Sequence, residues 1–458
     1  MLGIDDRTRK WWILAAMSGV LGLVVLDETV VGVALATIQP ELAMSQVASH
    51  WVVNAYLLTF TCFVAVGGRL GDVLGHRGFF VAGVAVFGLA SLAAGFAQSG
   101  AWLIAARGLQ GIGAAVVFPA SWAMMTSIFP AEQRGTAFGI QVTVGGLFMS
   151  MGPLLGGLFT ETLSWRWIFW INLPVVTVIA AVVWSAWTAP PAERSGAGKI
   201  DGPGLISLVA GLSALVIGLM QGAEWGWGAP ATLSLLGGGA VLLALFIVWE
   251  RRTAHPLIQL DLLREATFTG GILVFFMFQF NKVAVFVFVA LYLQHVLDFS
   301  PVEAGLVVMF AVLPTLVTSL LSGRAADRFG SRRPLFIGLS LNGAALILVA
   351  LATTVHHLAL IMAPLVVWGA MLPFIAVSAR RALMSAVPVA QQGEASGVNL
   401  TVQMLGGTVG MALCGALLVA TGTYWSLFLL TGGLVFVLLA VAWFTVERPA
   451  AVRSQGTP

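Results

Sequence analysis

The feature that most constrains this chain is a series of fourteen apolar runs, each 19 to 27 residues long. A helix of about 20 residues crosses the hydrocarbon layer of a membrane, which is roughly 30 Å thick. Helices are the open-ended structures that satisfy their backbone in lipid, and the alternation of a barrel strand is absent. We therefore expect an all-α membrane protein with 14 transmembrane helices. Their predicted ranges are 11–37, 50–68, 79–98, 100–124, 136–159, 167–188, 203–221, 230–249, 267–293, 302–322, 334–353, 358–378, 396–420 and 424–446.

Composition supports this class of protein and argues against others. With 59% hydrophobic and 9% charged residues, the chain of 458 residues has too few polar side chains to cover a soluble globule. Its 22 basic residues are scattered between the apolar runs, so we expect a lipid bilayer around the protein and no nucleic-acid partner. Cys62 and Cys414 stand singly inside apolar runs, which predicts neither a disulfide nor a metal site.

The basic residues also predict the orientation in the membrane. If the N-terminus is cytoplasmic, 19 of the 22 lie in segments on the cytoplasmic side, whereas the outer segments hold only Arg166. An excess of Lys and Arg marks the cytoplasmic loops of membrane proteins. We therefore expect a multi-pass protein of the plasma membrane, the inner membrane of a bacterium. Both termini should lie in the cytoplasm.

A charged loop occurs twice. The segments Gly67–Arg77 (GGRLGDVLGHR) and Ser322–Arg333 (SGRAADRFGSRR) each follow an even-numbered predicted helix and align at one offset. Such a pair predicts two parallel repeats related by an axis along the membrane normal. Each half then holds six helices, and two more are inserted between the halves. The expected domains are 1–188, 189–266 with a linker and the two extra helices, and 267–458.

Five segments of the chain carry recognisable motifs. They are LDETVVGVAL in the first helix, GRLGDVLGHR after the second, RGLQGIGAA in the fourth, GPLLGG in the fifth and WRWIFWINLP at the start of the sixth. These motifs make the chain similar to the major facilitator superfamily, in its fourteen-helix drug:proton antiporter branch, and the resemblance covers nearly the whole chain. Gly32, Ala36 and Phe148 stand where that branch usually has Asn, Pro and Gly.

The resemblance implies a major-facilitator-type fold and a secondary active transporter. Such a protein exports hydrophobic or amphipathic small molecules in exchange for protons, by alternating access of two six-helix bundles. We expect a monomer without enzyme activity or cofactor, with the proton gradient as its energy source. Two other functions stay open: a proton symporter or uniporter of a metabolite, and a membrane receptor or scaffold without transport.

Two sets of residues are expected to act in conformational gating. Loop glycines allow tight turns, and loop Asp and Arg side chains can pair across the seam between the halves in one conformation. The fifth-helix glycines give a smooth surface that either flexes and seals or simply packs. The gating residues are Gly68, Arg69, Asp72, Gly75, Arg77, Gly152, Pro153, Gly156, Gly157, Arg324 and Asp327.

Four ionisable residues lie inside the predicted spans: Asp27, Glu28, Arg107 and Lys282. Such groups are costly near the bilayer centre unless paired or solvated, and they mark functional sites. At about 1.5 Å per residue, three of them fall in one layer, roughly 20 to 22 Å above the inner face.

Asp27, with Arg107 and Gln110, is the expected proton-coupling group. Burial favours the neutral form of a carboxyl group and a nearby cation favours its charged form, so alternate exposure to the two sides would load and unload one proton. Substrate and proton would then displace each other by reciprocal linkage. The alternative is a permanent Asp27–Arg107 pair that fixes helix register.

Lys282 lies among phenylalanines at helical spacing, a face that suits amphipathic, aromatic or anionic substrates. A phenylalanine stripe is equally compatible with a lipid-facing or core surface. Glu28 is either a second protonation or cation site or part of a helix contact. The residues assigned to the substrate site are Glu28, Asn54, Tyr56, Phe278, Gln279, Lys282 and Phe286.

Overall fold

The structure is a computed structural model, which describes residues 6–187, 201–253, 256–258, 260–388 and 391–446. These residues form helices and no strand. Among them, 14 helical segments are long and apolar enough to cross a membrane. The expected class and number of helices are therefore confirmed.

Six spans form the N-terminal half, and the sixth is interrupted. Its helices are α1 (Asp6–Glu41), α2 (Gln46–Leu74), α3 (His76–Gly95), α4 (Gly100–Ile128), α5 (Ala131–Thr162), α6 (Trp167–Trp170) and α7 (Asn172–Ala186).

Two inserted spans follow, and six further spans form the C-terminal half. The inserted helices are α8 (Gly202–Trp225) and α9 (Pro230–Glu250). The C-terminal half begins with a 3₁₀ turn, η2 (Leu260–Arg264), and its first span has a π-helical segment, η3 (Val285–Val289), between two α-helices. The helices of this half are α10 (Ala266–Ala284), α11 (Ala290–His295), α12 (Pro301–Val312), α13 (Thr315–Phe329), α14 (Arg332–Val355), α15 (Leu358–Ser385), α16 (Gln392–Thr421) and α17 (Tyr424–Thr445).

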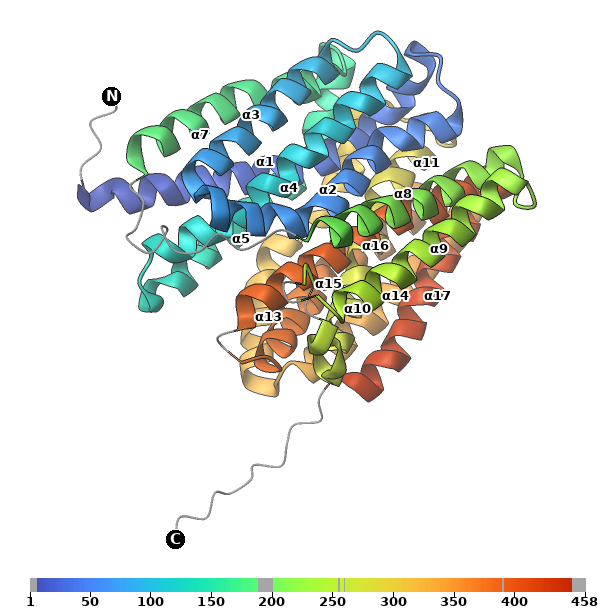
Figure 1. Cartoon of the computed structure of the whole chain (residues 1–458). Helices are drawn as coiled ribbons and strands as arrows, with labels where there is room; N and C mark the ends of the chain where they lie inside the picture. The colour runs from blue at the N-terminus through green and yellow to red at the C-terminus, as the bar shows by residue number, and fades with distance from the viewer. Residues whose placement is uncertain (1–5, 188–200, 254–255, 259, 389–390, 447–458) are drawn as a thin grey trace.

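The two halves lie side by side, with the inserted helices at their boundary. Figure 1 shows the N-terminal bundle above the C-terminal bundle, with α8 running along the boundary between them. Apolar side chains of α8, among them Leu208 and Leu212, pack in one cluster with Leu58 of α2 and Ala412 of α16. We call the side where α1 begins and α17 ends the terminal face, and the opposite side the distal face.

Backbones of the two halves approach most closely on the distal side. A Cβ added at Gly157 of α5 would meet the Pro301 carbonyl of α12, and one at Gly305 of α12 would meet the Pro153 carbonyl. Towards the terminal face α13 packs mainly against α15, and its Val317 and Leu320 are exposed. Arg380 of α15 lies 5.5 Å from the Trp122 ring of α4 on that side. Among the described residues, the close backbone contacts between α5 and α12 therefore lie on the distal side.

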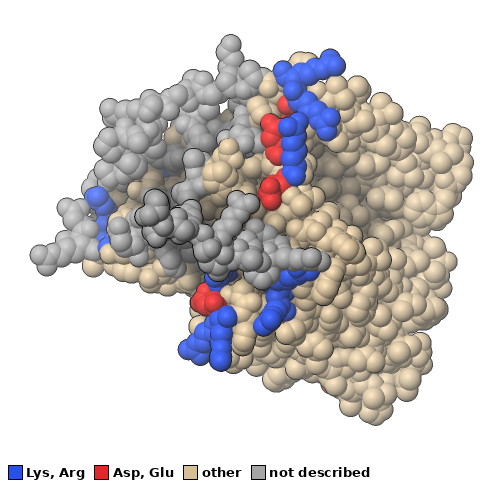
Figure 2. Space-filling view, turned by 90° about the horizontal axis from the view of Figure 1, so that it is seen from below, with Lys and Arg blue, Asp and Glu red and all other residues tan. Residues whose placement is uncertain are grey.

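Charged side chains occupy a limited part of the face that Figure 2 shows. In Figure 2 the blue and red residues gather on the side of the grey segments, and a broad uncharged surface extends beyond them. Large apolar side chains such as Val317, Trp443 and Phe444 are exposed, the last by 85%. An apolar belt of this kind fits a protein embedded in lipid.

Candidate functional site

Asp27 lies inside the N-terminal half, at the centre of a fully buried polar network. Its Oδ2 accepts a hydrogen bond from Arg107 Nη1 at 2.5 Å, as part of an ion pair. Its Oδ1 accepts from Gln110 Nε2 at 2.7 Å and from Asn172 Nδ2 at 3.2 Å. The two amide groups also donate to Ser91 Oγ, at 2.9 and 3.2 Å. The network therefore joins α1, α3, α4 and the start of α7.

Arg107 is held by groups of the same half. Its Nε donates to the Val52 carbonyl at 3.0 Å, and its Nη1 also donates to Gln110 Oε1 at 2.6 Å. Its guanidinium lies 4.4 Å from the Tyr56 ring and 5.8 Å from the Phe169 ring. A cation–π contact of this kind stabilises a charge that is only 1% exposed.

The network suits an ionised Asp27. Each described partner of the carboxylate is an N–H donor, and an ionised carboxylate is an acceptor only. The side chain is 0% exposed and none of these partners comes from the C-terminal half. The described hydrogen-bond partners of Asp27 therefore all belong to its own half.

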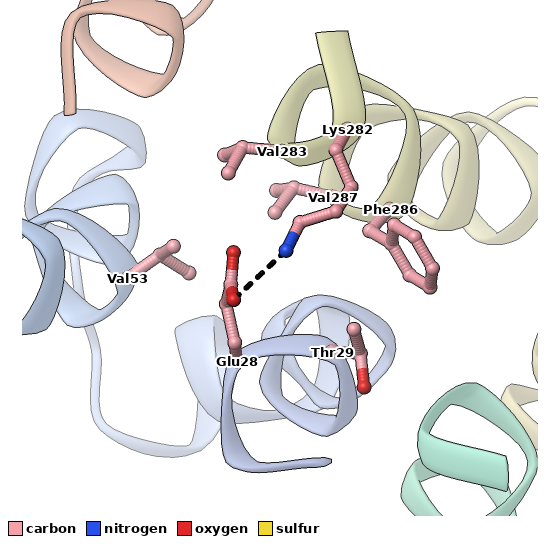
Figure 3. Close-up of a pocket in the computed structure, with 7 residues that line it drawn as sticks. All are labelled: Glu28, Thr29, Val53, Lys282, Val283, Phe286 and Val287. Carbon is pink, nitrogen blue, oxygen red and sulfur yellow. Dashed lines mark hydrogen bonds and ion pairs between the residues drawn. The ribbon is translucent and has the colours of Figure 1, made fainter. Parts of the chain in front are cut away.

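Glu28, the next residue, forms an ion pair across the seam between the halves. Its Oε2 lies 3.0 Å from Lys282 Nζ of α10, and its Oε1 accepts from Gln279 Nε2 at 2.5 Å. Gln279 Oε1 in turn accepts from Gln403 Nε2 of α16 at 3.4 Å. Figure 3 shows the two charged side chains extending towards each other from opposite helices. Their side chains are only 9% and 7% exposed, so this pair is almost entirely buried.

A π-helical segment next to Lys282 brings the two helices together. A Cβ added at Gly32 of α1 would lie 2.8 Å from the Phe286 carbonyl in η3. One turn separates Gly32 from Glu28 and Phe286 from Lys282, so the glycine contact and the ion pair share one interface. Further along it, Gln294 Nε2 donates to the Val33 carbonyl at 2.8 Å. Gly32, which departs from the family motif, is thus the residue that permits this approach.

A small pocket of about 10 Å³ lies beside the Glu28–Lys282 ion pair, with room for about one water molecule. Three of the expected substrate residues, Glu28, Lys282 and Phe286, line it. Its other lining residues are Thr29, Val53, Val283 and Val287. The pocket therefore lies between α1, α2 and the first span of the C-terminal half.

The remaining residues expected at the substrate site lie elsewhere. Asn54 is fully buried against the inserted helix α8, where its Nδ2 donates to the Met220 sulfur at 2.6 Å. Tyr56 covers Arg107 inside the N-terminal half, and its buried hydroxyl has no hydrogen-bond partner among the described residues. Phe278 is partly buried and packs edge-on against Phe275, with ring centroids 6.3 Å apart. None of the three lines the pocket, because helix rotation directs their side chains away from it.

The C-terminal half has its own buried polar network, without charges. Asn281 Nδ2 donates to Asn342 Oδ1 at 3.5 Å, and Trp368 Nε1 donates to Asn281 Oδ1 at 3.3 Å. Asn342 Nδ2 donates to the Trp368 carbonyl at 3.3 Å. These residues lie on the first, third and fourth spans of their half, as do Asp27, Ser91 and Arg107 of theirs.

The repeated loops adopt equivalent conformations in the two halves. Gly75 and Gly330 end α2 and α13 with φ of 86° and 77°, in the left-handed region that favours glycine. Arg77 donates to the Trp184 carbonyl at 2.6 Å, and the matching Arg332 donates to the Trp443 carbonyl at 2.9 Å. Each arginine thus binds the C-terminal end of the last helix in its own half, where cations are favoured.

The loops form no described ion pair across the seam in this structure. Asp327 pairs at 2.5 Å with Arg381, a residue of the same half, and Arg324 is exposed. Gly68, Arg69 and Asp72 lie in α2, and the surroundings of Gly68 and the side chains of Arg69 and Asp72 are outside the part that the structure describes. Asp327 is thus paired within its own half, and the expected pairing of Arg69 and Asp72 with the other half stays a prediction.

The fifth-helix motif is a close packing surface on two sides. Added Cβ atoms at Gly152 and Gly156 would meet Thr29 and the Val30 carbonyl of α1, whereas Gly157 faces α12. Pro153 lies inside α5, and its carbonyl approaches Gly305. These residues join α1 to the close contact between α5 and α12.

Three residues were not singled out by the sequence. Asn172 belongs to the segment WRWIFWINLP. A polar residue near the start of an otherwise apolar span was the sequence signal that could have identified it as a site residue. Ser91 is one small polar residue in an apolar span and gave none. His50, near the start of α2, is 2% exposed, edge-on to Phe288 at 5.4 Å and close to Gly415 of α16. Its Nε2 has no hydrogen-bond partner within the described chain.

The described residues contain no group of three His, Cys, Asp or Glu side chains that could hold a metal ion. Both cysteines are free and buried. Two six-helix bundles that meet at a seam, with one buried ion pair inside the N-terminal bundle and one across the seam, define a multi-pass membrane transporter.

Comparison with known proteins gives the family. The model of the Major Facilitator Superfamily matches residues 17–249 and 271–458. This chain belongs to that superfamily, and it is a secondary transporter rather than an enzyme. Its fold is similar to that of the POT family transporter PepTSo, with a TM-score of 0.69, 13% identity and coverage of 96% of this chain and 98% of that one.

Several bacterial relatives are named as export or resistance proteins. The chain is 35% identical to the puromycin resistance protein pur8 of Streptomyces alboniger, covering 88% of this chain and 81% of the relative. It is 34% identical to the cephamycin export protein CmcT of Amycolatopsis lactamdurans, covering 94% and 91%. It is 31% identical to the tetracenomycin C resistance and export protein of Streptomyces glaucescens, covering 90% and 76%. These relatives and the 14 apolar helices indicate a multi-pass protein of the bacterial plasma membrane.

Proposed function

We propose that this protein exports hydrophobic or amphipathic small molecules in exchange for protons, by alternating access of its two halves. The observation that carries the proposal is Asp27, an acid fully buried in a transporter and bonded to one arginine and neutral amides. The named activities of the relatives support export, and they supply puromycin, tetracenomycin C and cephamycins as compounds to test.

Asp27, Arg107 and Gln110 couple the proton to transport in this proposal. The ionised carboxylate and the guanidinium balance each other inside the N-terminal half. Protonation of Asp27 cancels its charge and frees Arg107, which changes how α1 packs against α4. Bound substrate favours loss of the proton and protonation favours loss of the substrate, because the two equilibria are linked.

Glu28 and Lys282 form the centre of the substrate site, with Gln279 and Phe286 beside them. The site lies between the halves, so rocking of the bundles opens it to one side at a time. Asp27 and Glu28 are consecutive on α1, and any rotation of this helix moves both carboxylates. Protonation of Asp27 therefore alters the substrate site by moving α1, and with it the Glu28 carboxylate.

The terminal face is cytoplasmic in our proposal, because it holds the excess of basic residues. The structure then corresponds to a form closed towards the outside. The repeated loops, including Gly68, Arg69 and Asp72, and the α5 glycines gate the exchange between forms. The protein works as a monomer, with domains 1–188, 189–266 and 267–458, and its energy source is the proton gradient.

Everted membrane vesicles test the proposal. An imposed pH gradient, acidic inside, should partly collapse when puromycin, tetracenomycin C or a cephamycin is added. Asp27→Asn should abolish this response, whereas Asp261→Asn, which changes a carboxylate that is 88% exposed, should preserve it. A normal response in Asp27→Asn vesicles, or none with any of the three compounds in wild-type vesicles, would contradict the proposal.

A further inference from the structure

The site between the halves, which we call the seam site, contains one positive and one negative side chain. Glu28 contributes one negative charge and Lys282 one positive charge, and each is the other's ion-pair partner. The other polar groups bonded there, Gln279 and Gln403, are neutral. Both oxygens of Glu28 are already used, one by Lys282 and one by Gln279. A ligand that reaches Glu28 must therefore replace donors that come from α10.

The two charges belong to different halves of the transporter. Glu28 lies on α1 and Lys282 on α10, and α1 touches η3, the segment that continues α10, at Gly32 and Phe286. Any movement that separates these helices breaks the ion pair and leaves two opposite charges facing the opened site. Arg107 cannot replace Lys282, because it is bound to Asp27 inside the N-terminal half.

The number of charges on a ligand then decides how well it replaces the ion pair. A ligand with one positive charge pairs with Glu28 and leaves Lys282 buried without a partner, and a ligand with one negative charge leaves Glu28 alone. Leaving one member of a buried pair uncompensated is strongly unfavourable. A ligand with one charge of each sign satisfies both residues at once.

We infer that the seam site selects zwitterionic amphiphiles, which carry an amine and an anionic group on an apolar body. The amine binds Glu28, the anionic group binds Lys282, and the apolar body packs against Val53, Phe286 and Val287, which line the pocket. This inference rests on the proposed export function, since it names the substrate class of the same site. The ion pair between Glu28 and Lys282 occupies the site when no ligand is bound.

Four probes that share one apolar body test the inference. They are 3-(2-naphthyl)alanine as the zwitterion, its methyl ester as the cation, its N-acetyl derivative as the anion, and the N-acetyl methyl ester as the neutral form. Binding to the purified full-length protein is measured by calorimetry. Wild-type protein should bind the zwitterion at least about tenfold more tightly than any other probe, a difference of about 1.4 kcal/mol.

Charge-removing variants should change this order in opposite directions. Lys282→Met should favour the methyl ester, Glu28→Gln should favour the N-acetyl derivative, and the double variant should favour the neutral probe. The double variant removes both charges together, so it stays informative if a single variant folds poorly. Lys10→Met, which removes a partly exposed lysine bonded to Gln133 far from the seam in sequence, is the control and should keep the wild-type order.

The same order of probes in all variants, or tightest binding of a singly charged probe to wild type, would overturn the inference. So would failure of all four to bind a protein that still couples export of another compound to protons. That coupling is measured separately in the vesicles described above. A flat vesicle response with zwitterion-selective binding would instead contradict the export proposal and leave the inferred selectivity standing.

Discussion

Asp27 and Glu28 are consecutive residues, yet their side chains enter different parts of the molecule. Asp27 points into the N-terminal half, where it bonds to Arg107, Gln110 and Asn172. Glu28 points across the seam, where it bonds to Gln279 and Lys282 of the other half. Successive residues of an α-helix are about 100° apart, so one helix can serve both places.

The difference between these two ion pairs separates two tasks. A pair within one bundle persists while the bundles rock as bodies, so it changes only when its protonation changes. A pair between bundles must break when the bundles separate, so it responds to conformation and to ligand. The first arrangement is suited to carrying a proton, and the second to closing the substrate site.

The C-terminal half sharpens this contrast. Its network of Asn281, Asn342 and Trp368 lies on the equivalent spans, but consists of neutral groups. Neutral amides bind or release no proton near neutral pH. The two halves therefore share a buried polar arrangement at equivalent places, and we assign proton coupling to the charged one.

The largest expected effect comes from breaking the pair inside the N-terminal half. Arg107→Met leaves the Asp27 carboxylate buried without its cation, and loss of one partner of a buried pair costs about 3 to 5 kcal/mol. The free energy of unfolding, measured in detergent with a denaturant series, should fall by that amount. Asp27→Asn combined with Arg107→Met should recover a large part of it, because no unpaired charge remains. Equal destabilisation of the single and double variants would contradict a coupled pair.

A smaller effect is expected from separating α1 and η3. Gly32→Ala introduces a Cβ that would lie 2.8 Å from the Phe286 carbonyl, and overpacking of this kind costs about 1 to 3 kcal/mol. The seam should loosen. Thr408 of α16 reports on it, because this fully buried residue has its hydroxyl 3.1 Å from that of Thr61 of α2. We would measure faster labelling of Thr408→Cys by a thiol reagent in a background without Cys62 and Cys414. Gly19→Ala is the matched control, since its added Cβ would have ordinary contact with Ile179 at 3.6 Å. Unchanged labelling in Gly32→Ala would show that this contact does not hold the seam.

The smallest effect should come from the neutral network. Asn342→Ala removes hydrogen bonds to Asn281 and Trp368, and each is worth about 0.5 to 1.5 kcal/mol. The midpoint of thermal unfolding should drop modestly, while the pH response of vesicles on addition of substrate remains. Loss of that response would mean that the C-terminal half also takes part in proton coupling.

Much of the fold follows from the sequence, because membrane spans leave a strong signal. Apolar runs of sufficient length predicted all 14 helices, and the repeated loops predicted the two halves. The turns at Gly75 and Gly330 also agree with the predicted role of glycine. Depth along the helices placed Asp27 and Arg107 in one layer, and the structure brings them into contact.

The partners across the seam could not be predicted in this way. Depth gives the height of a residue but not its direction, so Lys282 could be matched with either carboxylate of α1. The pairing of Lys282 with Glu28 depends on the rotation of the helices and on the π-helical segment that follows Lys282. Neither has a signal in this sequence. The same limit explains why Asn54 and Tyr56 face α8 and Arg107 instead of the pocket.

The central claim, that Asp27 carries the proton and Glu28 does not, is tested most directly by proton release from purified protein. Puromycin, tetracenomycin C or a cephamycin, whichever the wild type exports, is added in weakly buffered solution. The number of protons released is divided by the number of ligand molecules bound. We predict release from wild type and from Glu28→Gln, and none from Asp27→Asn. Release that persists in Asp27→Asn but disappears in Glu28→Gln would contradict the account.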